Sequence, residues 1–293
     1  MKLTRILGVV FILIISGSFS FQKVDYRNGM HKNVCKNLRN NALVYIVFVD
    51  NKTTTPWTEF DIRSTMDSVS VVRKWLMEQA KKYSIPLNIQ TDYYIGKDFT
   101  TISKNLTGGS VYKTAITPNF KKGLAELNSW SDWIARKAGT TMDISQKDGI
   151  REIKNPRNKE RLIAYLRDTY KVESVALLFM VNNYFKNDIS LQINTMSTDD
   201  IEFAIVSYKY PSEIAHNILH LYGAADMHKS LYRRNEKKIK QLSVLFPNEI
   251  MQDPYAKNIW NLEISDYSRY LIGWQETYDS QLEELFIDKN VNY

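Results

Sequence analysis

The segment that most constrains this chain runs from Ser212 to Met227 and reads SEIAHNILHLYGAADM. His216 and His220 stand four positions apart among apolar residues that recur at helical spacing, so both imidazoles should leave one helix face about one turn apart. Gly223 then permits a left-handed backbone that can return Asp226 toward the same point. Two imidazoles and a carboxylate suit zinc and leave a fourth position for water or substrate. We therefore predict a Zn²⁺ site formed by His216, His220 and Asp226.

The order HxxxHxxGxxD resembles the motif of the metzincin clan of zinc peptidases, in the form that has aspartate as its third ligand. Ile250 and Met251 resemble the Met-turn of that clan, which implies that Met251 lies beneath the metal as an apolar floor. The alternative for Met251 is a methionine that only fills the core. The matching region extends from Pro211 to Trp274 and is similar to secreted bacterial proteins of this type. The resemblance implies a zinc metallopeptidase that hydrolyses peptide bonds with metal-activated water.

One position departs from the clan's motif. Asn217 follows the first histidine, where the clan has glutamate. That glutamate takes a proton from the zinc-bound water and passes it to the leaving amine, whereas an amide does not titrate. Because losing a general base usually costs roughly 10²–10⁴ in rate, we expect impaired hydrolysis. The alternatives are a catalytically inactive homologue that binds peptides or a partner protein in the same cleft, and a deliberate replacement that traps an inactive form.

Four further side chains are candidates for the same site. Tyr255 could donate to an oxyanion, as a tyrosine does in some clan members, although an ordinary packed tyrosine is the other interpretation. His228 is an alternative third ligand, but we favour an ordinary loop residue. Glu213 and Glu249 are the nearby acids that could replace the missing base. Glu213 precedes His216 by three positions and should lie a turn away from the metal-bound water, so it is a poor substitute. Glu249 remains a candidate for the missing base.

The amino terminus has the three-part form of a secretory signal peptide. Basic residues in positions 1–5 precede an apolar run from Ile6 to Ile15 and the small residues that end at Ser20. We predict cleavage after Ser20 and a secreted or periplasmic protein, with an uncleaved membrane anchor as the alternative. No later stretch is long enough to span a bilayer. Residues 21–41 would form an extension and 42–293 one metzincin-like domain, divided into an upper part (42–223) and a lower part (224–293).

Composition narrows the partners. Cys35 is the only cysteine, which excludes an intramolecular disulfide. Its thiolate could bind the zinc and keep the protein latent, but a free thiol is the default interpretation. The formal net charge is +7, and removal of Lys2 and Arg5 with the signal leaves +5 (7 − 2). The basic run from Arg233 to Lys240 is best interpreted as a solvated helix face or loop, and no nucleic-acid-binding module is recognisable. We expect a monomer that acts on a peptide or protein and binds no nucleic acid.

Alternating segment types predict an α+β fold. The continuous apolar run Ala42–Val49 indicates a strand buried on both faces, and apolar residues at helical spacing, Phe60 among them, indicate a long helix over Thr58–Tyr83. Further strands are expected at 87–94, 175–181, 189–193 and 201–208, and further helices at 120–137, where Trp133 falls on the apolar side, at 161–170 and at 264–274.

This order predicts a three-layer sandwich, in which a mixed, twisted sheet lies between helices and a small helical subdomain follows. It is also the order of the metzincin upper subdomain. If the resemblance holds, Ile189–Ile193 is an edge strand that pairs with an extended peptide. The alternative is a protected edge.

Overall fold

The computed structural model describes residues 37–52, 55–96, 101–105, 120–142, 158–182, 190–193, 201–207, 210–230 and 235–286. The expected signal peptide, nearly all of the 21–41 extension, Cys35 and part of the basic run lie outside the described residues.

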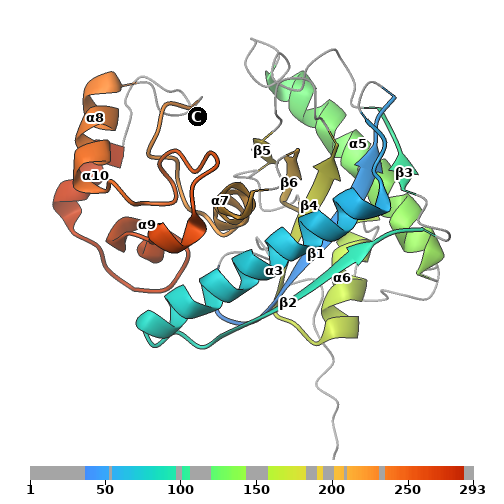
Figure 1. The fold of residues 1–293 in the computed structure, drawn as a ribbon, viewed down its shortest axis with the longest axis horizontal. Helices are drawn as coiled ribbons and strands as arrows, with labels where there is room; N and C mark the ends of the chain where they lie inside the picture. Colours follow the sequence, from blue (N-terminus) through green and yellow to red (C-terminus); the bar gives the residue numbers. More distant parts are fainter. Residues whose placement is uncertain are drawn as a thin grey trace, which may run out of the picture.

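A mostly parallel sheet forms the centre of the molecule (Figure 1). Its strand order is β2-β1-β4-β6-β5, and β3 also pairs with β1. All of these pairs are parallel except that of β5 with β6, which is antiparallel and places β5 at one edge. The strands are β1 (Asn40–Asp50), β2 (Leu87–Tyr94), β3 (Ile102–Ser103), β4 (Ser174–Val181), β5 (Ser190–Ile193) and β6 (Phe203–Val206). The predicted α+β class and mixed sheet are therefore confirmed.

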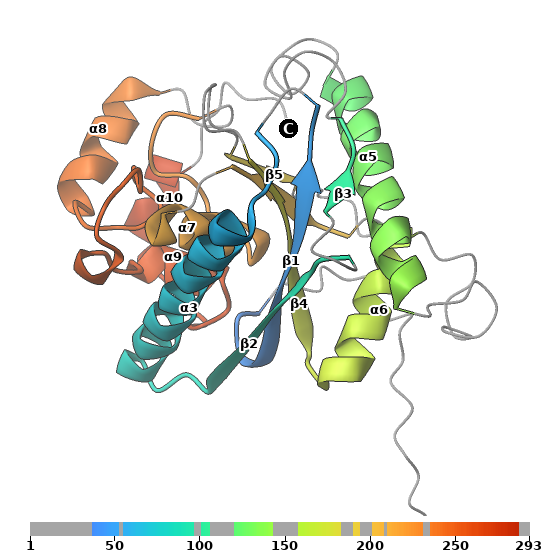
Figure 2. The same cartoon turned by 45° about the vertical axis from the view of Figure 1, so that its right-hand side comes forward.

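Helices cover both faces of this sheet (Figure 2). One face carries α3 (Glu59–Lys82) and α7 (Pro211–Leu221), and the other carries α5 (Phe120–Thr141) and α6 (Asn158–Tyr170). Every residue of β4 is buried, as are the eight central residues of β1. A strand covered on both faces needs apolar side chains at consecutive positions, which is why these strands are continuous apolar runs.

Helix α3 begins where its sequence predicts, but one apolar residue was assigned to the wrong face. Thr58 Oγ1 accepts a hydrogen bond from the Asp61 backbone N–H at 3.1 Å, and the Asp61 carboxylate accepts one from the Thr58 N–H at 3.3 Å. This reciprocal capping box fixes the start of the helix. Phe60, predicted to pack inward, is 77% exposed, whereas Ile62 of the same turn is 1% exposed, so Phe60 lies on the solvent side of the helix.

Trp133 of α5 was also predicted to be buried and is 36% exposed. The Lys104 ammonium lies 4.5 Å from the centre of its ring and the Lys137 ammonium 5.5 Å. The indole therefore packs under two cations at the surface, an arrangement that stabilises an exposed ring by a cation–π interaction.

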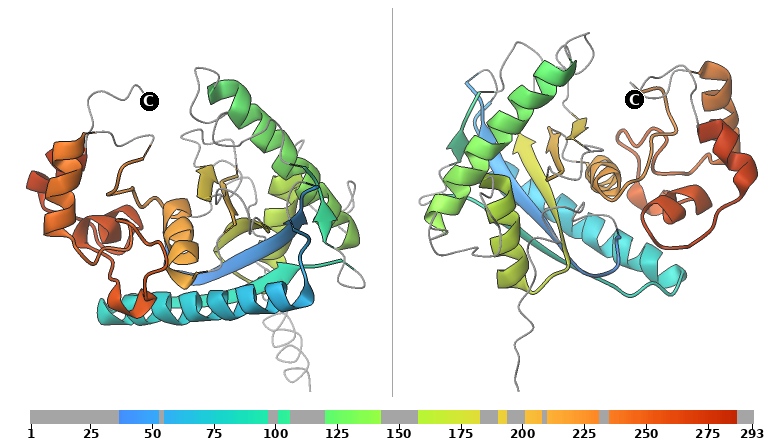
Figure 3. Two further views of the ribbon diagram at one scale, coloured as in Figure 1. Left: turned by 45° about the horizontal axis from the view of Figure 1, so that its top comes forward. Right: turned by 180° about the vertical axis from the view of Figure 1, so that it is seen from behind.

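The carboxyl-terminal part of the chain lies to one side of α7 (Figure 3). It contains α8 (Glu236–Leu245), the short 3₁₀ helix η2 (Ile259–Asn261), α9 (Asp266–Leu271) and α10 (Ser280–Phe286). The closing helix expected over 264–274 is shorter, because Ser265 caps α9 and Gly273 adopts a positive φ of 77° just beyond it.

This part is tied to the sheet by the residues just before β1. The Trp274 indole N–H donates to the Leu38 carbonyl at 2.6 Å, and the Leu38 N–H donates to the Ile272 carbonyl at 3.0 Å. Among the described residues, no helix has the length and apolar character needed to cross a membrane.

Candidate metal site

Helix α7 presents two histidines to one point. It is buried over almost its whole length, because it packs between the sheet and the carboxyl-terminal part. His216 and His220 are each 5% exposed, and their Nε2 atoms lie 2.9 Å apart. The predicted placement of both imidazoles on one face, one turn apart, is therefore observed.

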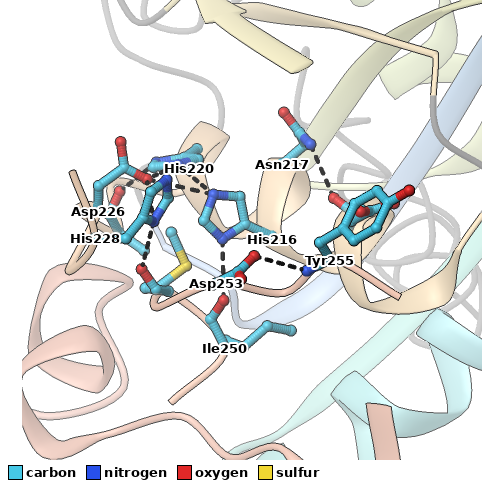
Figure 4. Close-up of polar contacts among 11 residues, drawn as sticks. His216, Asn217, His220, Asp226, His228, Ile250, Asp253 and Tyr255 are labelled. Atoms are coloured by element: carbon cyan, nitrogen blue, oxygen red, sulfur yellow. Dashed lines mark hydrogen bonds and ion pairs between the residues drawn. The ribbon is translucent and has the colours of Figure 1, made fainter. Parts of the chain in front are cut away.

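Asp226 approaches this pair from the loop that follows α7 (Figure 4). Its Oδ1 atom lies 2.8 Å from the Nε2 of His220 and 3.3 Å from the Nε2 of His216. The Asp226 side chain is 12% exposed. The structure thus brings together the three side chains that the sequence predicts as ligands.

Backbone carbonyls fix the tautomer of both rings. The Nδ1 of His216 lies 3.0 Å from the carbonyl oxygen of Ile250, and the Nδ1 of His220 lies 2.8 Å from that of Ala224. A carbonyl oxygen only accepts, so each Nδ1 carries the proton and donates it. Each Nε2 then presents a lone pair to the other ring and to Asp226, which is the second-shell arrangement of metal-binding histidines.

The donor geometry fits a small divalent ion. The two Nε2 atoms and Asp226 Oδ1 form a triangle with edges of 2.8, 2.9 and 3.3 Å. Tetrahedral coordination with bonds of about 2.0–2.1 Å needs edges of about 3.3 Å, so binding would spread two edges by a few tenths of an ångström. Oδ1 is buried and faces the ring nitrogens of the histidines, so a cation placed between these atoms would satisfy the carboxylate and both imidazoles together.

His228 also lies near this cluster, where the alternative interpretation as a ligand would place it. Its Nδ1 lies 3.7 Å from Asp226 Oδ1 and 3.3 Å from the carbonyl oxygen of Met251. His216, Asp226 and His228 form a group that could hold a metal ion, with ligand atoms all within 4.8 Å of one another. The sequence signal was the presence of three of the chain's four histidines within positions 216–228.

Burial and the mutual contacts shift the pKa values of this cluster. Burial, and next the neighbouring His220, lower the pKa of His216 below its ordinary value, which favours the neutral ring. Burial alone would raise the pKa of Asp226, but positive charge on His220 and hydrogen bonds from the His216 and His220 rings outweigh it and hold that pKa well below its usual range, as a bound cation also would. Neutral imidazole and ionised carboxylate are the protonation states that bind a metal.

Gly223 makes the turn that returns the chain to α7. Its φ is +101°, and its N–H donates to the His220 carbonyl at 3.0 Å. The next residue, Ala224, donates its N–H to the Leu219 carbonyl at 3.0 Å and offers its own carbonyl to His220. The turn at Gly223 therefore positions two groups: the Ala224 carbonyl, which accepts from His220, and the carboxylate of Asp226, two residues after Ala224.

The segment that resembles a Met-turn acts through its main chain. The carbonyl of Ile250 accepts from His216, and that of Met251 accepts from the Met227 N–H at 2.8 Å and faces His228. The Met251 side chain is fully buried. Adjacent carbonyls thus brace two histidines, which the sequence alone did not predict.

Glu249 connects this turn to the start of α9. Its carboxylate accepts hydrogen bonds from the N–H of the N-cap residue Ser265 and, at 2.8 Å, from the Ser268 hydroxyl in the first turn. Burial raises its pKa to about 7, despite the opposing hydrogen bonds from Ser268 and Ser265. Since both oxygens are engaged at α9, Glu249 is not placed as a substitute base.

The remaining predicted site residues point elsewhere. Asn217 is completely buried, and its amide nitrogen donates to the Glu213 carbonyl one turn earlier at 2.8 Å. Tyr255 is 55% exposed and packs edge-on against Tyr210, with ring centres 6.1 Å apart. Figure 4 shows its hydroxyl directed away from the three histidines. This arrangement fits the packed-tyrosine interpretation better than an oxyanion donor.

Comparison with known proteins adds no relative to this picture. Neither the models of protein families nor the curated proteins with which the sequence was compared match the chain. The assignment of the site therefore depends on its geometry.

We expect Gly223→Ala to destabilise the fold and weaken the site. A left-handed backbone costs a non-glycine residue about 1–2 kcal/mol, and a Cβ here would lie 3.0 Å from the Leu271 carbonyl oxygen. Chemical denaturation should show this loss, and Gly223→Asn should lose less because asparagine tolerates positive φ better. Equal stability of Gly223→Ala and wild type would contradict this role.

Glu249 should give the protein a distinctive pH dependence. Its folded pKa of about 7 lies above its ordinary value of 4.5, so the folded state binds more protons between these pH values. Its stabilising contribution is therefore complete below pH about 4.5 and is lost as the pH rises through about 7, a change of roughly 3 kcal/mol.

The measurement is the free energy of unfolding of wild type, Glu249→Gln and Glu263→Gln at several pH values in the presence of chelator. Glu249→Gln should remove the loss of stability between pH about 4.5 and 7, while Glu263→Gln, a change at an exposed neighbouring acid, should preserve it. Parallel pH curves for Glu249→Gln and wild type would rule out a titrating Glu249.

Proposed function

We propose that this chain is a zinc-binding protein of metallopeptidase type, with Zn²⁺ held by His216, His220 and Asp226. The observation that carries the proposal is the convergence of two imidazole lone pairs and one carboxylate oxygen within 3.3 Å, with each imidazole braced by a carbonyl. The order of strands and helices along the chain supports the proposal as well. As expected for the clan's upper subdomain, the helix that carries the two histidines, α7, packs directly beside the sheet. The resemblance to the metzincin clan names the class.

The cleft of such a protein would bind an extended peptide along β5. Within the described part of the chain, β5 is the last strand at its edge of the sheet and runs antiparallel to β6. An edge strand offers unpaired N–H and C=O groups to a segment that adds to the sheet. Because α7 packs against β5 and β6, a peptide paired there would pass close to the histidines.

Bound zinc would supply a Lewis acid that polarises the scissile carbonyl and lowers the pKa of a water molecule. The chain's own residues supply orientation but no proton acceptor at position 217. The Asn217 amide donates into its own helix and has no titratable group. We therefore propose a secreted metallopeptidase-like protein whose hydrolysis is slow by roughly 10²–10⁴.

The second candidate is a catalytically silent protein that uses the same cleft to bind a peptide or a partner protein. The burial of Asn217 and its bond to the Glu213 carbonyl favour it, because a residue in that role is part of the helix and not of a catalytic centre. The two candidates share the metal and differ in turnover.

Elemental analysis of the purified protein tests the metal. We expect about one zinc per chain in wild type, and loss of most of it in His220→Ala, because that change removes one of three donors. A chelator should also lower the melting temperature of wild type, since a ligand bound only by the folded state stabilises it. Equal zinc contents in wild type and His220→Ala would defeat the assignment.

Asn217→Glu distinguishes the two candidates. If only the general base is missing, zinc-replete Asn217→Glu should cleave a denatured protein substrate about 10²–10⁴ times faster than wild type. Asn217→Gln is the matched control, since it has the same length as glutamate without a titratable group. No gain from Asn217→Glu in a protein with full zinc content would favour the binding module.

A further inference from the structure

We propose that His228 is the fourth protein donor of the metal, so that the site is closed by the chain itself. This inference rests on the proposed zinc site, and it favours the second candidate, the binding protein, over slow hydrolysis. It assigns a ligand beyond the three that the HxxxHxxGxxD motif supplies, and it changes what kind of metal site this is.

The first argument is a shared pattern of bracing. The Nδ1 atoms of His216, His220 and His228 lie 3.0, 2.8 and 3.3 Å from a backbone carbonyl oxygen. In each case the carbonyl fixes the proton on Nδ1 and leaves the Nε2 lone pair for another partner. His228 shares this carbonyl contact, but its Nδ1 also lies 3.7 Å from Asp226 Oδ1, so its ring must turn to present Nε2 to the ion.

The second argument is position. Figure 4 shows the His228 ring beside Asp226 and close to His216. The ring centres of His216 and His228 are 5.6 Å apart, and the ligand atoms of these two residues and Asp226 all lie within 4.8 Å of one another. Donors of a tetrahedral ion lie about 3.3 Å apart, so His228 needs to move by about 1 Å or more.

The third argument is freedom to make that movement. The His228 side chain is 36% exposed, whereas those of His216 and His220 are 7% and 6% exposed. His228 lies on the loop after Asp226, where its Nδ1 faces the Met251 carbonyl and the neighbouring Met227 N–H donates to the same carbonyl. The inner donors are buried and His228 is partly exposed, so we infer that His228 is the residue that moves to close over the ion.

Four protein donors leave no position for water or a scissile carbonyl. Closed tetrahedral sites are characteristic of metals that stabilise a fold, whereas catalytic zinc sites keep one position open. Asn217 and His228 therefore agree, since the first removes the proton acceptor and the second fills the reactive position. Both favour a metal that holds the cleft in shape for binding.

The experiment measures coordination directly and does not depend on turnover. Wild type, His228→Ala, His228→Gln and the neighbouring exposed control Lys229→Ala are compared for Zn²⁺ affinity by competition with a chromogenic chelator. Each is then loaded with Co²⁺, and its visible absorption is recorded before and after addition of azide. Azide binds cobalt only where a coordination position is open or held by water.

We expect Zn²⁺ affinity to fall in His228→Ala by at least the roughly 10- to 100-fold that is typical for loss of an outer-shell partner, and to stay unchanged in Lys229→Ala. His228→Gln keeps a donor for the Met251 carbonyl, so affinity as low as in His228→Ala would assign the loss to the metal bond. The cobalt spectrum of wild type should not respond to azide, whereas that of His228→Ala should.

Two results overturn the proposal in different ways. Equal affinities for wild type and His228→Ala, together with an azide response in both, would remove His228 from the site and leave the three-donor site intact. Failure of wild type itself to bind zinc would remove the proposed function along with this inference. Restoration of wild-type affinity in His228→Gln would also overturn it, because bracing of Met251 alone would then explain the effect.

Discussion

The structure around α7 depends on one electrostatic requirement, the burial of three lone pairs that face one another. Two imidazole nitrogens and a carboxylate oxygen converge within 3.3 Å, where water cannot separate them. Such a group is unfavourable without a cation and strongly favourable with one. The folded chain preorganises these donors for a metal, because the hydrogen bonds from Nδ1 to the backbone carbonyls hold the orientation of both rings.

Those braces come from two distant parts of the chain. The Ala224 carbonyl is provided locally by the turn at Gly223, whereas the Ile250 carbonyl comes from 34 residues beyond His216. The turn that contains Ile250 is held by the buried Glu249, whose carboxylate is hydrogen-bonded to the start of α9. The site therefore forms only when the carboxyl-terminal part packs against α7, which couples metal binding to the folding of the whole domain.

The proposed zinc site departs from the clan's motif at one position and has one further histidine beside it. Asn217 stands where the clan has glutamate and donates within its own helix, while His228 belongs to a group with His216 and Asp226 that could hold a metal ion. If both residues act as proposed, hydrolysis is slowed and the metal organises the cleft. Pairing of a peptide with the antiparallel edge strand would need no proton transfer.

The sequence by itself predicted the main strands and the long helices of the sheet domain, and it named the donor set. Continuous apolar runs predicted β1 and β4, apolar residues at helical spacing predicted α3, and the spacing of His216, His220 and Asp226 predicted three donors, because these features are local and depend on backbone periodicity. Tertiary structure decided the rest. The exposure of Phe60 and Trp133, the engagement of Glu249 at α9 and the approach of His228 all depend on which segments pack together. Contacts between residues distant in sequence leave no periodic signal in a single chain, so only the folded arrangement shows them.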